Sequence, residues 1–262
     1  MEPEPVCLVR GGGDLATGVV WRLHRQGYRV VVTELPTPLT VRRLVSVSTA
    51  VLEGRAVVEG MTAQRANAAA GALEILHNGD VAVLIDDGLP DVGASVVVDA
   101  RMAKRNIDTS IGDAELVIAL GPGFVAGVDA HAVIETARGP RLGRCLWEGS
   151  ATPDTGTPGL IEGWGAERVI RALVDGSVEW QVDIGAWVEH GEVVGSVDGQ
   201  LIRAPFPGRV RGLIHPSTPV RAGLKIGDID PRSDVAADEI SDKALAVAGG
   251  VMEAVGTWRR SH

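Results

Sequence analysis

A run of three glycines directly after a short apolar segment is the first place where this sequence could do chemistry. The segment GGGDLA at residues 11–16 fits the G-x-G-x-x-G/A spacing of loops that hold a pyrophosphate. Gly11 would allow the tight turn, Gly12 follows it, and Gly13 would let the backbone approach a phosphate at a helix N-terminus. Ala16 would let the helix pack closely on the preceding strand. The spacing predicts a site for a nucleotide or another phosphate-bearing ligand.

The residues around this turn both support and weaken that prediction. Glu34 lies 21 residues after Gly13, at the end of the next predicted strand, where its carboxylate could accept a hydrogen bond from a ribose hydroxyl. An acid at this place favours NAD over NADP, because it repels a 2′-phosphate. Asp14 puts a negative charge where a phosphate would lie and could instead cap the helix. Thr17 adds a polar side chain to the first turn. A Rossmann-like turn without a dinucleotide is the alternative.

The most polar stretch of the chain, residues 96–136, follows further predicted strands. In open α/β sheets ligands bind at the carboxyl ends of the strands, so polar side chains there are candidates. Arg101, Lys104 and Arg105 would form a cationic clamp for phosphate or another oxyanion. A solvated loop of mixed charge is the alternative. The other polar residues that follow the same strand end are Asp99, Asn106, Asp108 and Thr109.

A Gly-Pro-Gly loop and a histidine follow the next predicted strand. Gly121 and Gly123 permit the close backbone approach that a ligand loop needs, although a plain turn would use the same residues. His131 is either a structural residue at a strand start or the imidazole best placed to act as a general acid or base. No set of His, Cys and Asp has metal-ligand spacing, so no metal site is predicted. The proton-transfer candidates are Asp99, Asp108, Asp129 and His131.

Alternating strand and helix patterns surround these residues. The alternation predicts a Rossmann-like α/β domain with a mostly parallel sheet over residues 1–176. The expected helices lie at about 15–26 and 61–79. The expected strands lie at 6–10, 29–33, 81–87, 95–101, 114–120, 131–136 and 142–149.

From about residue 177 the pattern changes to alternating valine and glycine with frequent turns. The segments VEHGEVVGSV and IRAPFPGRV, residues 188–197 and 202–210, resemble the biotinyl/lipoyl-type hybrid barrel. Carrier versions of that barrel hold their prosthetic group on a lysine at the hairpin tip between the two segments. Here the tip reads Asp198-Gly199-Gln200, so the resemblance implies a scaffold or docking barrel. We expect residues 177–262 to form this small β-rich domain and a C-terminal helix at about 241–254.

The composition excludes some classes of partner. The net charge is −9 and there is no basic run, so nucleic acid and anionic membranes are poor partners. Hydrophobic residues make up 45% of the chain, which is ample for a core. Cys7 and Cys145 are far apart and fit neither a disulfide framework nor a zinc site. With no signal segment or long apolar run recognised, we expect a cytoplasmic protein.

Three segments together resemble the YqeB-type accessory proteins of selenium-dependent molybdenum hydroxylase systems. They are residues 9–43 around the glycine turn, residues 96–136, and GLKIGDIDPR at residues 223–232, and the likeness covers nearly the whole chain in the same order. The resemblance implies a role in maturing a molybdenum hydroxylase, with labile selenium at the cofactor. It also implies a role similar to that of the XdhC-type accessory proteins, which pair a Rossmann-like domain with handling of the molybdenum cofactor.

The sequence thus supports one main hypothesis and two rivals. The main one is an accessory protein that binds molybdopterin or a nucleotide and whose partners are a molybdenum hydroxylase client or its maturation proteins. The first rival is an NAD-dependent oxidoreductase, for which no catalytic Tyr/Lys or His/Asp pair can be assigned. The second is a non-enzymatic interaction protein whose glycine turn is only structural. Self-association and catalytic turnover are left open.

Overall fold

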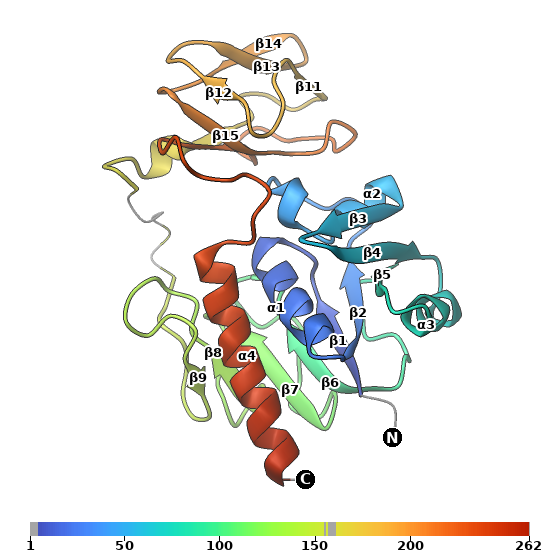
Figure 1. The fold of residues 1–262 in the computed structure, drawn as a ribbon. Coiled ribbons are helices and arrows are strands. Elements are labelled where there is room, and N and C mark those ends of the chain that lie inside the picture. Colours follow the sequence, from blue (N-terminus) through green and yellow to red (C-terminus); the bar gives the residue numbers. More distant parts are fainter. Residues whose placement is uncertain (1–4, 155, 157–160, 262) are drawn as a thin grey trace. The chain divides into compact units, whose positions relative to one another are not determined.

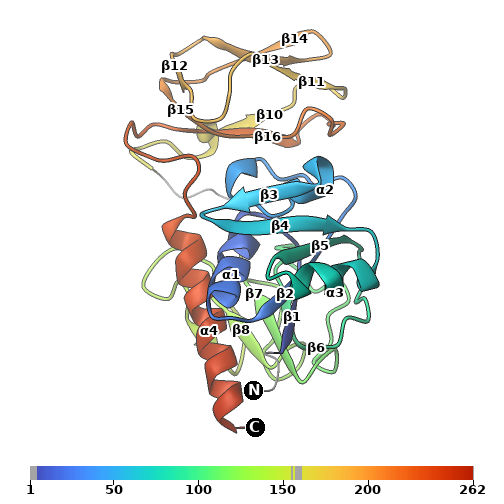
Figure 2. The same ribbon diagram turned by 45° about the vertical axis from the view of Figure 1, so that its right-hand side comes forward.

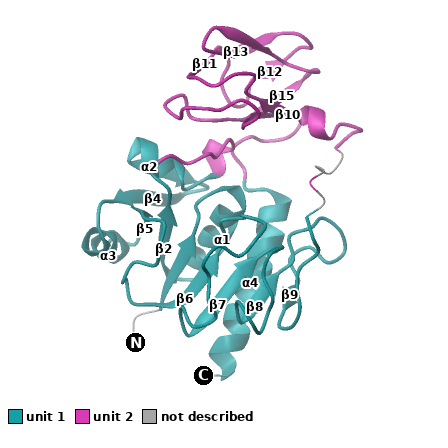
Figure 3. Ribbon diagram, turned by 180° about the vertical axis from the view of Figure 1, so that it is seen from behind, with its two compact units in different colours: residues 1–36, 46–155, 240–262 teal, residues 37–45, 156–239 magenta. Residues whose placement is uncertain are grey.

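The structure is a computed structural model that describes residues 5–154, 156 and 161–261. The chain divides into two compact units (Figure 3). Unit 1 comprises Met1–Pro36, Ser46–Thr155 and Ile240–His262, and unit 2 comprises Thr37–Val45 and Gly156–Glu239. Within the described residues, no helix combines the length and apolar character that crossing a bilayer requires.

The centre of unit 1 is a sheet of nine described strands, most of them parallel (Figure 1). Only the outer pairs β3–β4 and β8–β9 run antiparallel. Strands buried on both faces read as continuous apolar runs, as β1 (VCLVR) and β7 (LVIAL) do. The order is β3 (Arg55–Val58), β4 (Met61–Ala66), β5 (Val81–Ile85), β2 (Arg29–Glu34), β1 (Val6–Arg10), β6 (Ala94–Asp99), β7 (Leu116–Leu120), β8 (Ala132–Ile134), β9 (Cys145–Leu146).

The chain winds outward from β1 in both directions. β2 and β5 extend the sheet on one side of β1, and β6, β7 and β8 extend it on the other. The connections after β1 and β6 therefore start next to each other at the carboxyl edge of the sheet and diverge from there. Such a reversal of strand order is where open α/β sheets place their ligands.

Helices cover both faces of this sheet (Figures 1 and 2). α1 (Asp14–Arg25) packs against α4 (Asp242–Ser261), and a Cβ added at Gly18 would lie only 2.8 Å from the carbonyl oxygen of Ala244. α3 (Ala69–His77) packs on the other face, where its Ala72 joins Leu8 of β1 in one hydrophobic cluster. The short α2 (Thr49–Glu53) leads into β3.

Unit 2 contains two antiparallel sheets. Their inner faces share a hydrophobic core that includes Val188, Phe206 and Ile229. The hairpin between the last two strands of the smaller sheet turns at Asp198 and Gly199, whose φ angles of 45° and 80° match the turns that tight hairpins favour. The larger sheet is β10 (Val169–Arg171), β16 (Lys225–Asp230), β15 (Gly208–Leu213), β12 (Trp187–Val188), and the smaller is β11 (Val178–Trp180), β13 (Val193–Val197), β14 (Gln200–Arg203).

The predicted fold class is confirmed at the level of a large, mostly parallel α/β sheet, an antiparallel β region and a C-terminal helix. The predicted helix over 61–79 is wrong in its first half, because Met61–Ala66 forms β4. The buried side chains there include Met61, Ala63 and Ala66, a largely alternating pattern, and the strand pairs with β3 and β5. Pairing with neighbouring strands outweighs the helix propensity of these alanines.

The division of the chain also differs from the predicted boundary near residue 176. β10 pairs with β16, so the chain already belongs to unit 2 from Gly156. Residues Thr37–Val45 also belong to unit 2, where η1 (Arg43–Val45) lies and Arg43 donates a 2.7 Å hydrogen bond to the Leu213 carbonyl. α4 belongs to unit 1 because it packs on α1, and it extends to Ser261 rather than about residue 254.

Candidate functional site

Two buried charged residues lie side by side at the carboxyl edge of the sheet, where the strand order reverses. Arg10 is the last residue of β1 and Asp99 the last of β6, and the two are direct partners in the parallel register. Arg10 is 1% exposed and Asp99 is 2% exposed. Burying a charge is costly unless it is paired and hydrogen-bonded, so the partners of these two groups define the site.

Arg10 holds three groups of the loops that follow β5 and β6. Its Nη1 lies 2.8 Å from Asp108 Oδ1, and its Nη2 donates to Asp108 Oδ2 at 3.0 Å, so the pair is bidentate. Arg10 also donates to Thr109 Oγ1 at 3.2 Å and to the Asp87 carbonyl at 3.1 Å. The hydrogen bond from Arg10 is the main reason why the pKa of Asp108 is lowered to about 2.

Arg101 completes the group from the other side. It donates to both carboxylate oxygens of Asp99, at 2.6 Å from Nη2 to Oδ2, and to Asp108 Oδ1 at 2.7 Å. Thr109 donates its hydroxyl to Asp99 Oδ2 at 2.6 Å. Burial alone would lower the pKa of Arg101, but its hydrogen bonds to the two aspartates outweigh burial and the pKa is raised. We call Arg10, Asp99, Arg101, Asp108 and Thr109 the arginine cluster.

The glycine turn lies directly beside this cluster. Gly11 has a φ of 94°, and a Cβ there would lie 3.1 Å from Arg101 Cα. The amide of Gly12 donates to Glu34 Oε2 at 2.8 Å, so the acid at the end of β2 reaches the turn. A Cβ at Gly12 would lie 2.9 Å from the amide nitrogen of Ser48, so this position has no room for a side chain. The structure thus brings together the glycine turn and Glu34, which the sequence predicts to be neighbours.

The first turn of α1 differs in part from expectation. Gly13, in extended conformation, is the N-cap, and Asp14 is the first helical residue rather than the cap. Thr17 is fully buried, donates to the Gly13 carbonyl at 2.9 Å and accepts from the Val47 amide at 3.0 Å. The structure therefore places Thr17 in the core and not on the surface of the turn. Ala16 is buried, as close packing of the helix requires.

The expected clamp of Arg101, Lys104 and Arg105 does not form. Lys104 is 60% exposed and its Nζ lies 2.7 Å from Asp154 Oδ2, and Arg105 is exposed as well. The guanidinium that joins Arg101 is that of Arg10, which the sequence reasoning missed. Its signal was an arginine at the end of an otherwise apolar strand, directly before the glycines.

Asn106 and the Gly-Pro-Gly loop shape the surroundings of the cluster. Asn106 accepts from the Thr109 amide at 2.9 Å, donates to the Thr109 carbonyl at 2.8 Å, and donates to Asp129 at 3.1 Å. A Cβ at Gly123 would collide with the backbone of Arg105, and Gly121 faces the Thr136 side chain. These glycines therefore allow two loops to pack on each other rather than line an open surface.

His131 does not join the acids. Its Nδ1 accepts from the amide of Val117, near the start of β7, at 3.0 Å. That is the amino edge of the parallel sheet, opposite the edge that carries Asp99 and Asp108. Of the four proton-transfer candidates, Asp99 and Asp108 lie in the cluster, and Asp129 connects to it through Asn106.

A second charged group lies in unit 2, within the GLKIGDIDPR segment. Asp230 is fully buried and receives two hydrogen bonds from the Arg232 guanidinium, at 2.8 and 2.9 Å, and one from Arg211 at 3.3 Å. Burial would raise the pKa of Asp230, but the bonds from Arg232 lower it. Lys225 pairs with Asp228 at 3.3 Å. These bonds give the segment a structural role in the sheet.

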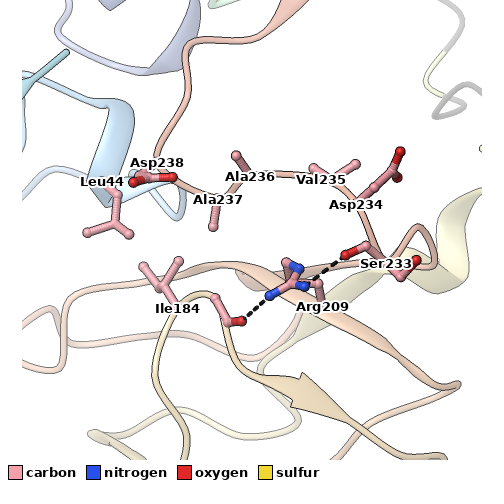
Figure 4. A pocket seen from close by; sticks show the side chains of 10 residues that line it. Leu44, Ile184, Arg209, Ser233, Asp234, Val235, Ala236, Ala237 and Asp238 are labelled. Atoms are coloured by element: carbon pink, nitrogen blue, oxygen red, sulfur yellow. Dashed lines mark hydrogen bonds between the residues drawn. The ribbon is translucent and has the colours of Figure 1, made fainter.

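The cavity described in unit 2 has a volume of about 510 Å³ (Figure 4). It lies between Ile184 and the segment Ser233–Asp238. Arg209 forms one wall, and its guanidinium donates to the carbonyls of Gly185 and Ser233 at 2.7 and 2.8 Å. This arginine thus braces the surrounding backbone, and none of the sequence-predicted site residues lines the cavity.

Neither cysteine has the surroundings of a reactive thiol. Cys7 is completely buried in β1. Burial, with a smaller contribution from Glu253, raises the pKa of Cys145 to about 12. Among residues 5–154, 156 and 161–261, no three His, Cys, Asp or Glu side chains are grouped so that they could hold a metal ion.

Comparison with known proteins finds one curated relative of high similarity. The chain is 42% identical over 254 residues to the protein YqeB of Escherichia coli (strain K12), whose name, "Uncharacterized protein YqeB", states no function. The match covers 95% of this chain and 47% of YqeB, so the chain spans about half the length of that relative. No family model matches.

Among solved structures, an aspartoacylase family protein from Mesorhizobium loti matches with 14% identity. The match covers 88% of this chain and 86% of that one, with a TM-score of 0.27. A score this low supports no argument about the site.

Proposed function

We propose that this protein binds a phosphate-bearing cofactor at the carboxyl edge of the unit 1 sheet and serves the maturation of a molybdenum hydroxylase. One observation carries the binding half of the proposal. The glycine turn after β1 and the arginine cluster lie in contact where the strand order reverses, with the prospective Cβ of Gly11 3.1 Å from Arg101 Cα.

The strand order supports a Rossmann-like fold for unit 1. Taken in chain order, β1, β2, β5, β6, β7 and β8 occupy the positions 3-2-1-4-5-6 that dinucleotide-binding sheets use. β4, β3 and β9 extend this arrangement at its two edges. In such sheets the pyrophosphate lies against the glycine turn and the N-terminus of the first helix.

The groups around the turn suit a molybdopterin phosphate or its nucleotide form. The helix N-terminus and the two guanidiniums favour an anion. Each carboxylate oxygen of Glu34 accepts one backbone amide, from Gly12 and from Leu35, and each keeps a lone pair with which it could accept from a ribose hydroxyl. Ile85 ends β5, and Leu35 and Leu89 follow β2 and β5 at the same edge. All three are exposed, so they offer an apolar surface to a flat ring.

The maturation half of the proposal rests on sequence similarity. The three segments that resemble the YqeB-type accessory proteins span both units, and the chain is 42% identical to a protein of that name. The hybrid-barrel resemblance of unit 2, whose hairpin tip carries no lysine, suits docking of the client enzyme. A selenium-bearing ligand would be held without a thiolate, since Cys7 and Cys145 are unsuited to one.

The test is a thermal-shift comparison of wild type, Gly13→Glu and Gly71→Glu. Gly13 has a φ of −73°, so glutamate fits the backbone there but puts a carboxylate where a phosphate would lie. Gly71 lies in α3 with nothing within 4 Å of an added Cβ, so it controls for the same substitution in the same unit. The ligands are NAD(H), NADP(H), ATP, CTP, GTP and a molybdopterin preparation.

A ligand at 100 times its Kd should add about 2.7 kcal/mol of stability. Stabilisation of wild type and Gly71→Glu, but not Gly13→Glu, by molybdopterin or its nucleotide form would support the proposal. Copurification of a molybdenum hydroxylase would support its maturation half. Stabilisation by NAD(H) alone would favour the oxidoreductase. No shift with any ligand would leave the turn with a structural role and refute the proposal.

A further inference from the structure

The contacts that Asp108 makes are those expected of a bound oxyanion. Oδ1 receives Arg10 Nη1 at 2.8 Å and Arg101 Nη2 at 2.7 Å, and Oδ2 receives Arg10 Nη2 at 3.0 Å. Two guanidiniums thus converge on one carboxylate, one of them in the forked geometry that recognises phosphate and carboxylate equally well. An oxyanion of a ligand could therefore make the same contacts as the carboxylate of Asp108.

Asp108 is the most exposed charge of the arginine cluster. Its side chain is 49% exposed, whereas those of Arg10, Asp99 and Arg101 are 1%, 2% and 18% exposed. It lies in the connection between β6 and β7, which contains no helix. That connection includes Met102 and Lys104 at φ angles of 55° and 63°, which cost energy for residues other than glycine.

The rest of the cluster keeps its partners without Asp108. Arg101 retains its bonds to both oxygens of Asp99, and Arg10 retains Thr109 and the Asp87 carbonyl. When Asp108 moves away, the charges of the arginine cluster change from two positive and two negative to two positive and one negative. An empty position with one net positive charge, walled by a buried arginine, is a site for one anionic group.

We propose that Asp108 is an internal substitute for an oxyanion of the ligand, and that phosphate binding to Arg10 and Arg101 displaces it. This rests on the proposed function in assuming that the natural ligand carries a phosphate. Asp108 keeps the buried guanidiniums paired while the site is empty and competes with every incoming anion. Weak anions are thereby excluded, and a ligand that also contacts the glycine turn is selected.

The test measures binding of inorganic pyrophosphate by isothermal titration calorimetry to wild type, Asp108→Asn and Asp242→Asn. Asn keeps the shape of the side chain and removes the competing charge. Asp242 is the matched control, because it forms a bidentate pair with Arg138 at 2.9 and 3.2 Å in the same unit, but exposed. Asp108→Asn should bind pyrophosphate at least tenfold more tightly than wild type, and Asp242→Asn should behave as wild type. Adding Arg101→Met to Asp108→Asn should abolish the gain.

Unchanged or weaker binding by Asp108→Asn would overturn the proposal, as would an equal gain in Asp242→Asn. Should Asp108→Asn fail to fold, hydrogen exchange of wild type decides: pyrophosphate should change the exchange of residues 106–110, and no change there would overturn the proposal. The result is separable from the proposed function. A gain with pyrophosphate and no shift with any cofactor would contradict only the cofactor assignment, whereas Gly13-dependent cofactor binding without the gain would contradict only the role of Asp108.

Discussion

Replacing Arg10 by methionine tests whether this arginine organises the carboxyl edge of the sheet. Methionine keeps an unbranched apolar stem of similar reach and removes the guanidinium. The variant loses the bidentate pair with Asp108 and the hydrogen bonds to Thr109 and the Asp87 carbonyl. Asp99 keeps its bonds from Arg101 and Thr109, so the cluster is weakened rather than removed.

The expected loss of stability follows from what each partner does afterwards. Removing one member of a fully buried ion pair costs about 3–5 kcal/mol, because the other charge stays buried. Asp108 is 49% exposed, so water solvates its carboxylate and the cost falls below that range. The bonds to neutral groups contribute about 1 kcal/mol each. We therefore expect Arg10→Met to lower the free energy of unfolding by about 2–3 kcal/mol.

The assay is urea denaturation, with Arg138→Met as the control. Arg138 also forms a bidentate pair, with Asp242, but both side chains are at least half exposed, so its loss should cost less than about 1 kcal/mol. The slope of the free energy of unfolding against urea concentration should stay the same in both variants. A loss for Arg10→Met no larger than that for Arg138→Met would refute the reasoning that Arg10 holds the edge together.

Three further predictions concern the same unit. Because Arg10 holds the pKa of Asp108 at about 2, below the value of about 3.9 in an unfolded chain, Asp108 stabilises the fold above about pH 4, and this contribution is lost as the pH falls toward 2. An acid titration of the unfolding midpoint should show the loss in wild type and a smaller one in Arg10→Met; the same acid dependence in both would contradict the assignment. Gly12→Ala should destabilise the fold by about 1–3 kcal/mol, since its Cβ would lie 2.9 Å from the Ser48 amide nitrogen. Gly249→Ala in α4 meets nothing within 4 Å and should stabilise the fold by up to about 1 kcal/mol. Thermal melts in which Gly249→Ala unfolds at a lower temperature than Gly12→Ala would conflict with this account. Cys145, with its pKa near 12, and the buried Cys7 should resist iodoacetamide at pH 8 in the folded protein and react in urea; mass spectrometry showing rapid labelling of the folded chain would rule this out.

The features that depend on neighbours in sequence could be predicted from it. The strand before the glycines, the turn and Glu34 follow a known spacing, and the structure brings the carboxylate within 2.8 Å of the Gly12 amide. The burial of β1, β6 and β7 follows from their apolar runs. In each case the local pattern and the tertiary position agree.

The features that depend on partners distant in the sequence could not be predicted from it. Met61–Ala66 reads as helix until its pairing with β3 and β5 is known. Lys104 and Arg105 are as basic as Arg101, and only the path of the connection after β6 leaves them exposed. The role of Arg10 could not be predicted, because its partners, Asp108 and Thr109, are almost a hundred residues away in sequence. For His131 the sequence leaves a structural role and an acid–base role open, because it does not reveal at which edge of the sheet the chain re-enters.

The packing of α1 on α4 has a consequence for biosynthesis. α1 forms near the start of the chain, while the helix that covers its Gly18 face is translated only after all of unit 2. Until then Val19, Val20 and Leu23, which are fully buried in the finished fold, have an incomplete cover. Unit 1 therefore cannot reach its native state on the ribosome before residues 242–261 emerge. The apolar surface that α4 covers in the finished fold therefore stays exposed while unit 2 is synthesised, and incompletely folded chains with such surfaces are prone to aggregate.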